Sequence, residues 1–242
     1  MQDRRFMSSS QAQAANIDAG LRSYMLGVYN HMTIGMAITG FFAYLTKIMS
    51  VSEGMLTPFG TAIYASPLKW VIMLAPLVMV FWLSAKVQTM KPESARNLFY
   101  AFAAIMGISL SSLLLVFTGE SVIRVFFLTA ASFSALSIYG YTTKKNLTSM
   151  GSFLIMGLVG LILASIVNIF LASSAMQFII SVVGVLIFAG LTAYDTQRIK
   201  LMYQASDDRG TALKKSIMGA LTLYLDFINM FIMLLQLLGN RE

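Results

Sequence analysis

The sequence predicts an all-α polytopic membrane protein with seven transmembrane helices. Of its 242 residues, 57% are hydrophobic and 11% are charged, and the mean hydropathy is +0.75. Soluble domains carry about 25% charged residues, so the core of a soluble protein could not bury this much apolar surface. A helix needs about 20 residues to cross a bilayer, and seven apolar runs reach or approach that length.

The seven spans follow one another with no domain boundary between them. Most connections are short, apart from those after the first span and before the last. The second span is the shortest as bounded by charge, and Pro76 inside it favours a kink. The expected spans are Tyr24–Leu45, Trp70–Leu83, Leu98–Phe117, Val122–Thr142, Met150–Leu171, Met176–Tyr194 and Ile217–Leu238.

The first twenty residues, MQDRRFMSSSQAQAANIDAG, are polar and contain no apolar stretch of the kind that a signal peptide requires. We expect residues 1–20 to form a flexible cytoplasmic tail. Residues 21–242 then form one transmembrane domain, whose main partner is the lipid bilayer.

The basic residues predict the orientation of the chain in the membrane. With the N-terminus in the cytoplasm, the inner segments hold 13 of the 17 Lys and Arg residues and the outer segments hold 4. Lys and Arg are enriched in cytoplasmic loops, so this asymmetry favours a cytoplasmic N-terminus and a C-terminus on the opposite side.

Composition also argues against several functions. The net charge of +7 is spread over short loops, so no basic patch for nucleic acid is expected. The chain has no Cys and one His, which leaves little to build a zinc site. That residue, His31, is expected to be a neutral histidine hydrogen-bonded between helices rather than a pH switch.

Two acidic residues lie within the predicted spans. Asp195 ends the uncharged run FIISVVGVLIFAGLT in the sixth span, and Asp226 lies inside the seventh. A charged Asp at the centre of a membrane helix costs about 2.5–3.5 kcal/mol, so each should face the bundle interior and have a partner. A simpler alternative for Asp195 is an interfacial ion pair with Arg198, one turn away.

The last span carries a polar stripe around Asp226. Stripes of this kind occur on helices that pack at the centre of a bundle or line water, although ordinary helix–helix contacts produce a similar pattern. The acid in its middle favours a central or cavity-lining helix. The stripe comprises Gly219, Thr222, Asp226, Asn229, Met233 and Gln236, at spacings that place them on one helix face.

A tilted last helix could bring Asp226 to the level of Asp195. Two carboxylates in one dry pocket cannot both ionise easily, so the pair would titrate as a unit and could sense protons near neutral pH. When ionised, the same carboxylates would suit Ca²⁺, with oxygens from Asn229, Thr222 or Thr192 as further ligands. Protons and Ca²⁺ would then compete for the site.

Two motifs give the sequence a family resemblance. AGLTAYDTQRIK in the sixth span and LYLDFINMFIMLLQLLG in the seventh resemble the transmembrane Bax-inhibitor-motif family, in its bacterial branch. The resemblance implies a seven-helix fold whose last helix is central and wrapped by the other six. It also implies an inner-membrane Ca²⁺ leak that pH controls through Asp195 and Asp226, with Ca²⁺ as the transported ion and no resident cofactor.

Some bacterial relatives place an arginine at the inner end of the second span, where it latches the aspartates. Here Ser84 stands in the expected place and Lys86 is the nearest cation. Lys86 is therefore a hypothetical latch, although lysine lacks the bidentate geometry of arginine.

Two other functions compete with the ion leak. Bacterial members of the family include an inhibitor of a membrane-anchored AAA protease, and residues 1–20 could serve that role. Alternatively, Tyr194-Asp195 resembles half of an intramembrane aspartyl protease site, in which one carboxylate acts as base and the other as acid. Such proteases need glycines before the second Asp, whereas this chain has Leu223, Tyr224 and Leu225, so we expect no enzyme.

Overall fold

The computed structural model describes residues 9–241, with only the helical course given for residues 9–16. Seven helical segments in this part of the chain are long and apolar enough to cross a membrane, which confirms the predicted spans and the all-α polytopic class. The spans are α1 (Ser9–Ser50), α3 (Leu68–Lys86), α4 (Pro92–Leu110) continued by α5 (Leu113–Val116), α6 (Gly119–Thr142), α7 (Thr148–Leu171), α8 (Ser174–Leu201) and α9 (Arg209–Leu238).

Local sequence signals set several of these helix boundaries. Pro92 occupies the first turn of α4, where a missing N–H costs no hydrogen bond. Thr118, Ser173 and Asp208 precede α6, α8 and α9, and each accepts hydrogen bonds from backbone N–H groups of the first turn. Pro76 lies inside α3 and is buried.

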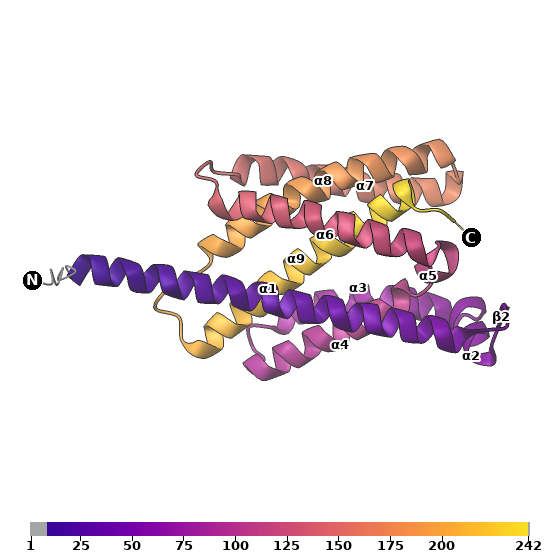
Figure 1. Ribbon diagram of the computed structural model, residues 1–242, viewed down its shortest axis with the longest axis horizontal. Coiled ribbons are helices and arrows are strands. Elements are labelled where there is room, and N and C mark those ends of the chain that lie inside the picture. The colour runs from indigo at the N-terminus through magenta and orange to yellow at the C-terminus, as the bar shows by residue number, and fades with distance from the viewer. Residues whose placement is uncertain (1–8, 242) are drawn as a thin grey trace, which may run out of the picture.

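Short elements connect α1 to α3. A two-stranded hairpin, β1 (Val51–Ser52) and β2 (Met55–Leu56), turns through Glu53 and Gly54, which both have positive φ angles. It is followed by α2 (Pro58–Gly60) and the π-helical segment η1 (Thr61–Ala65). This region lies at the end of the bundle opposite the N-terminus (Figure 1).

The long helices form two groups on either side of α9. One group contains α1, α3 and α4, the other contains α6, α7 and α8, and α9 runs obliquely between them (Figure 1). The last helix packs mainly against α8, α1, α6 and α4, whereas α3 lies on α4 and α7 lies on α8. The central position of α9 is confirmed, but four helices rather than six form its principal surroundings.

The first helix begins earlier in the sequence than the predicted first span. Of residues 1–20, expected to be a flexible tail, residues 9–20 continue the helix of the first span, and residues 1–8 lie outside the described part of the chain. At 1.5 Å per residue the 42-residue helix is about 63 Å long, roughly twice the hydrocarbon thickness of a bilayer. Its N-terminal part extends past the other helices (Figure 1).

Candidate functional site

Asp195 and Asp226 come together at the interface between α8 and α9. Their side chains are 8% and 5% exposed, and the two carboxyl groups lie within hydrogen-bonding reach of each other. The second carboxyl oxygen of Asp226, Oδ2, is buried without a hydrogen-bond partner. Because α9 crosses the bundle obliquely, Asp226, near the middle of α9, reaches Asp195, which lies two turns from the end of α8 (Figure 1).

Tyr224 fixes the rotation of α9 that points Asp226 toward α8. The Tyr224 side chain is fully buried, and its ring packs edge-on against Phe99 and Phe102 of α4. Its hydroxyl group lies 2.6 Å from Oγ1 of Thr39 on α1, which also donates to the carbonyl of Ala103. Two residues advance a helix by about 200°, so a Tyr224 held against α1 and α4 turns Asp226 to the other side.

A chain of hydroxyl groups holds α8 beside Asp195. Thr196, the next residue, is fully buried, and its Oγ1 lies 2.9 Å from Oγ of Ser137 on α6. The Ser137 hydroxyl in turn lies 2.6 Å from the hydroxyl of Tyr29 on α1. This chain joins α1, α6 and α8 at the level of the aspartate pair.

Gln197 and Lys200 of the AYDTQRIK motif attach α8 to the α6–α7 connection and to the end of α6. Gln197 donates from Nε2 to the carbonyl of Lys145 at 2.8 Å and accepts from the N–H of Leu147 at 2.9 Å. Lys200 donates to the carbonyl of Tyr141 at 2.8 Å. Charge and hydropathy alone do not indicate these roles of Thr196, Gln197 and Lys200, but their position beside Asp195 in the motif is a signal that they support it.

The aspartate pair has no ion-pair partner among residues 9–241. Arg198 lies near enough to act electrostatically on Asp195, but its side chain is exposed and no ion pair joins them. Lys86, the hypothetical latch, is exposed at the end of α3 and forms no ion pair with either aspartate. In the described chain the one ion pair is Lys215–Asp207, at 2.7 Å.

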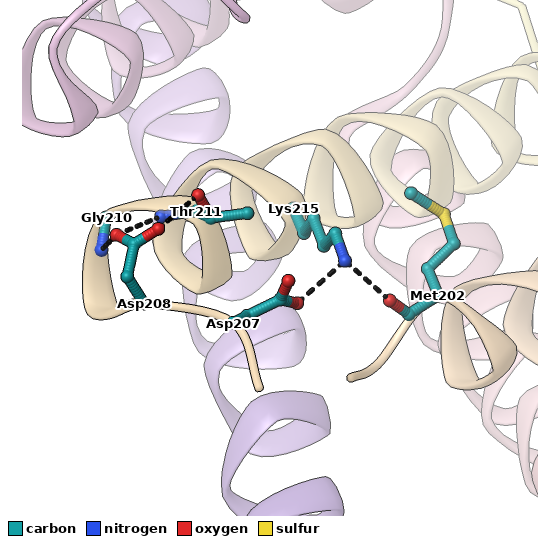
Figure 2. A network of polar contacts seen from close by, with 6 residues as sticks. All are labelled: Met202, Asp207, Asp208, Gly210, Thr211 and Lys215. Atoms are coloured by element: carbon teal, nitrogen blue, oxygen red, sulfur yellow. Dashed lines mark hydrogen bonds and ion pairs between the residues drawn. The ribbon is translucent and has the colours of Figure 1, made fainter. Parts of the chain in front are cut away.

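That ion pair belongs to a polar network that closes the α8–α9 connection. Lys215 also donates to the carbonyl of Met202, so it ties the start of α9 to the end of α8 (Figure 2). Asp208 caps α9 by accepting from the N–H groups of Gly210 and Thr211 and from the Thr211 hydroxyl. These hydrogen bonds, above all the one from the Thr211 hydroxyl, hold the pKa of Asp208 below its ordinary value.

Thr222 and Asn229, the expected supporting groups, are half-buried on α9. Each donates to the backbone of its own helix, Thr222 to the carbonyl of Met218 at 3.1 Å and Asn229 to that of Leu225 at 2.8 Å. Their oxygens remain able to accept or to bind a cation. Within the described residues no cluster of three or more His, Cys, Asp and Glu side chains is arranged to hold a metal ion.

Toward the C-terminal end of α9, the polar stripe of this helix faces α8. Met233 fits against Gly184, where a Cβ atom would lie 3.1 Å from the methionine sulfur. Beyond it, Gln236 is hydrogen-bonded to Gln177, which also accepts from Asn168 of α7. The α8–α9 interface therefore has one polar contact at the aspartate pair and another at Gln177 and Gln236, and Met233 packs against Gly184 between them.

His31 is placed as the sequence predicts, between two helices. Its Nδ1 lies 2.8 Å from the hydroxyl of Tyr100 on α4. The histidine thus joins α1 to α4.

Comparisons with known proteins identify the family. The profile of the family described as "Inhibitor of apoptosis-promoting Bax1" matches residues 21–242. The chain belongs to the Bax inhibitor family. An uncharacterized protein of Caulobacter vibrioides is 47% identical over 94% of this chain and 92% of its own length.

The inner membrane protein YbhL of Escherichia coli K12 is 43% identical, over 93% of this chain and 94% of its own. A Deinococcus radiodurans protein is 39% identical over 92% of both chains. This chain is thus a Bax inhibitor family membrane protein with an inner-membrane relative across nearly its whole length.

Proposed function

We propose that this protein is a pH-sensitive calcium leak channel of the bacterial inner membrane, gated by Asp195 and Asp226. The observation that supports the proposal most strongly is a buried carboxyl pair, lacking an ion-pair partner in the described chain, at the junction of the two best-buried spans. Acidic groups inside a membrane protein are costly and mark ion or proton pathways more often than they stabilise a fold.

The pair can act as a gate because its state of ionisation changes the force between α8 and α9. With one proton shared, a hydrogen bond joins the two carboxyl groups and holds the helices together. With both groups ionised, like charges in a buried site repel each other. The interface then opens at the end of the bundle where α8 ends and α9 begins. That end is the cytoplasmic one in the predicted orientation.

Calcium enters this scheme as the transported ion. Two ionised carboxylates attract a hard divalent cation, and the oxygens of Thr222 and Asn229 lie on the same face of α9. A site with so few charged ligands would bind Ca²⁺ briefly, as a leak requires. Lys86 and Arg198 are the cations that could move onto the pair, and Lys86→Ala tests the latch through the pH dependence of flux.

The experiment that tests the proposal is Ca²⁺ flux into proteoliposomes between pH 6 and 8. Wild-type protein should give a flux above that of empty liposomes, and the flux should rise with pH. Asp195→Asn and Asp226→Asn should each flatten this dependence, while Glu120→Gln, which changes an exposed acid at the start of α6, should leave it intact. No flux from folded protein at any pH would refute the channel.

The length of α1 favours a second candidate, modulation of a membrane-anchored AAA protease. The N-terminal part of this helix projects beyond the bundle, where a cytoplasmic partner could bind it (Figure 1). Deletion of residues 2–20 should abolish modulation of the protease and spare Ca²⁺ flux. If the deletion variant folds but loses both protease modulation and Ca²⁺ flux, the two functions do not reside in separate parts of the chain.

We propose no catalytic role for the aspartate pair. Leu223 and Tyr224, just before Asp226, are fully buried in helix packing, so a substrate backbone has no approach from that side.

A further inference from the structure

A long groove runs between α1 and α6 on one side of the bundle. These two helices both pack against α9 without packing extensively on each other, and α9 is seen between them in Figure 1. Two adjoining cavities, of about 670 and 330 Å³, fill the space and share Met36 and Phe126 in their linings. Phe227 of α9 contributes to the lining of the larger cavity.

The groove has a cation at each end and apolar side chains between. Arg22 lines the larger cavity near the N-terminal end, and Lys47 lines the smaller one near the opposite end. The two residues are 25 positions apart on one helix, or about 38 Å. This separation approaches the roughly 40–45 Å thickness of a bilayer with its headgroups, so each cation lies at the headgroup level of one leaflet.

The end of the groove at Arg22 is more polar than the end at Lys47. Hydroxyl groups of Tyr29, Ser134 and Ser137 lie in the lining there. Arg22 is the cation of this lining, since the nearby Lys200 is held by Tyr141, to whose carbonyl its Nζ donates and whose ring centre lies 4.9 Å from that Nζ. Basic pockets between transmembrane helices on the cytoplasmic side bind the headgroups of anionic lipids.

We propose that the larger cavity binds an anionic phospholipid, with its phosphate at Arg22 and an acyl chain lying along α9 past Phe227. A membrane-facing apolar groove with a basic mouth matches the two chemical parts of such a lipid. A second copy of this chain matches less well, because the acids of the described residues lie in the aspartate pair, near helix starts, in connections or, for Asp18, one turn before Arg22 at the start of the first span, and none lines the groove.

The groove reaches the aspartate pair through side chains already described. Tyr29 and Ser137 line the cavity and are hydrogen-bonded to each other. Ser137 is also hydrogen-bonded to Thr196, the neighbour of Asp195. A bound lipid would therefore contact the residues that hold α8 in place. Lipid binding itself does not depend on ion flux and is tested without it.

Native mass spectrometry of the full chain with dioleoylphosphatidylglycerol or dioleoylphosphatidylcholine tests the proposal. The protein should retain phosphatidylglycerol at least fivefold more than phosphatidylcholine. Arg22→Gln should remove most of that preference, and Ala130→Phe, which fills the cavity, should abolish retention of either lipid. The matched controls are Arg124→Gln, an exposed cation outside the lining, and Ala131→Phe, the next residue of α6, and both should behave as wild type.

Equal retention of the two lipids, or variants without effect, would overturn the proposal. So would a lipid-free dimer that Ala130→Phe dissociates, because the groove would then be a contact between two copies. Cross-linking of wild-type protein with phosphatidylglycerol carrying a diazirine in its acyl chain needs no variant. Labelling should concentrate on α1 and α6, and labelling spread equally over α3 and α7 would contradict the proposal.

Discussion

The carboxyl groups of Asp195 and Asp226 lie within hydrogen-bonding reach of each other, although they come from two different membrane-spanning helices. The contact depends on structural features well outside the pair. Tyr224 sets the rotation of α9, and Thr196 attaches α8 to α6. The predictions below test these supports, the orientation of the chain and finally the pair itself.

Tyr224 should be a major source of stability. Tyr224→Ala would leave a large cavity among Phe99, Phe102 and Thr39, and we expect it to lower the free energy of unfolding by roughly 3–5 kcal/mol. Tyr224→Phe keeps the ring and loses one hydrogen bond, which should cost about 1 kcal/mol. Denaturant unfolding in detergent measures both, and equal losses for the two variants would show that the ring packing is unimportant.

Gly140 should not tolerate a side chain. A Cβ atom there would overlap the carbonyl oxygen of Ala193, where α6 meets α8. We expect Gly140→Ala to lower stability by about 1–3 kcal/mol, since the crowded backbones must separate. Gly160→Ala is the matched control, because nothing lies within 4 Å of its Cβ position. The same unfolding assay applies, and similar effects at the two glycines would contradict the close approach of α6 and α8.

Asp208 should stabilise the start of α9 in a pH-dependent way. Its pKa is lowered in the folded protein by hydrogen bonds from Thr211 and Gly210, so its contribution is complete above the ordinary value of 3.8 and is lost as the pH falls through the folded value. Asp208→Ala should lower the melting temperature at pH 7 by a small amount. The difference from wild type should shrink toward pH 3, and a difference that stays constant would disprove the sign.

The predicted orientation can be tested directly because the chain contains no Cys. A single Cys at Glu53 lies in the β1–β2 turn, and one at Asn146 lies between α6 and α7. In intact cells an impermeant maleimide should label the Glu53→Cys variant and spare Asn146→Cys until the inner membrane is opened. The reverse pattern would place the N-terminus outside.

Much of the architecture is predictable from the sequence because a bilayer imposes simple rules. Charge-free runs of about 20 residues must be helices, since no water satisfies their backbone groups. The same reasoning singles out Asp195 and Asp226 as the acids within spans. Nothing local indicates that α9 contacts mainly four helices, because that depends on side-chain packing between distant segments.

The surroundings of the pair were harder to predict. Spacing suggests Arg198 as a partner of Asp195 and the family resemblance suggests Lys86 as a latch, yet both side chains are exposed in the structure. Thr196 and Ser137 meet only through tertiary packing, and hydroxyl-bearing residues are too common for spacing to reveal such a pair. The sequence also does not indicate that the first helix begins at residue 9, because polarity alone does not distinguish a polar helix from a tail.

The most direct test of the central claim is the pH dependence of Ca²⁺ flux for Asp195→Asn, Asp226→Asn and the double variant, measured together in proteoliposomes between pH 6 and 8. If the two carboxyl groups form one gating unit, either single substitution should flatten the dependence, and the double variant should behave like the singles. A pH dependence that survives in either single variant, or is lost only in the double variant, would contradict the claim.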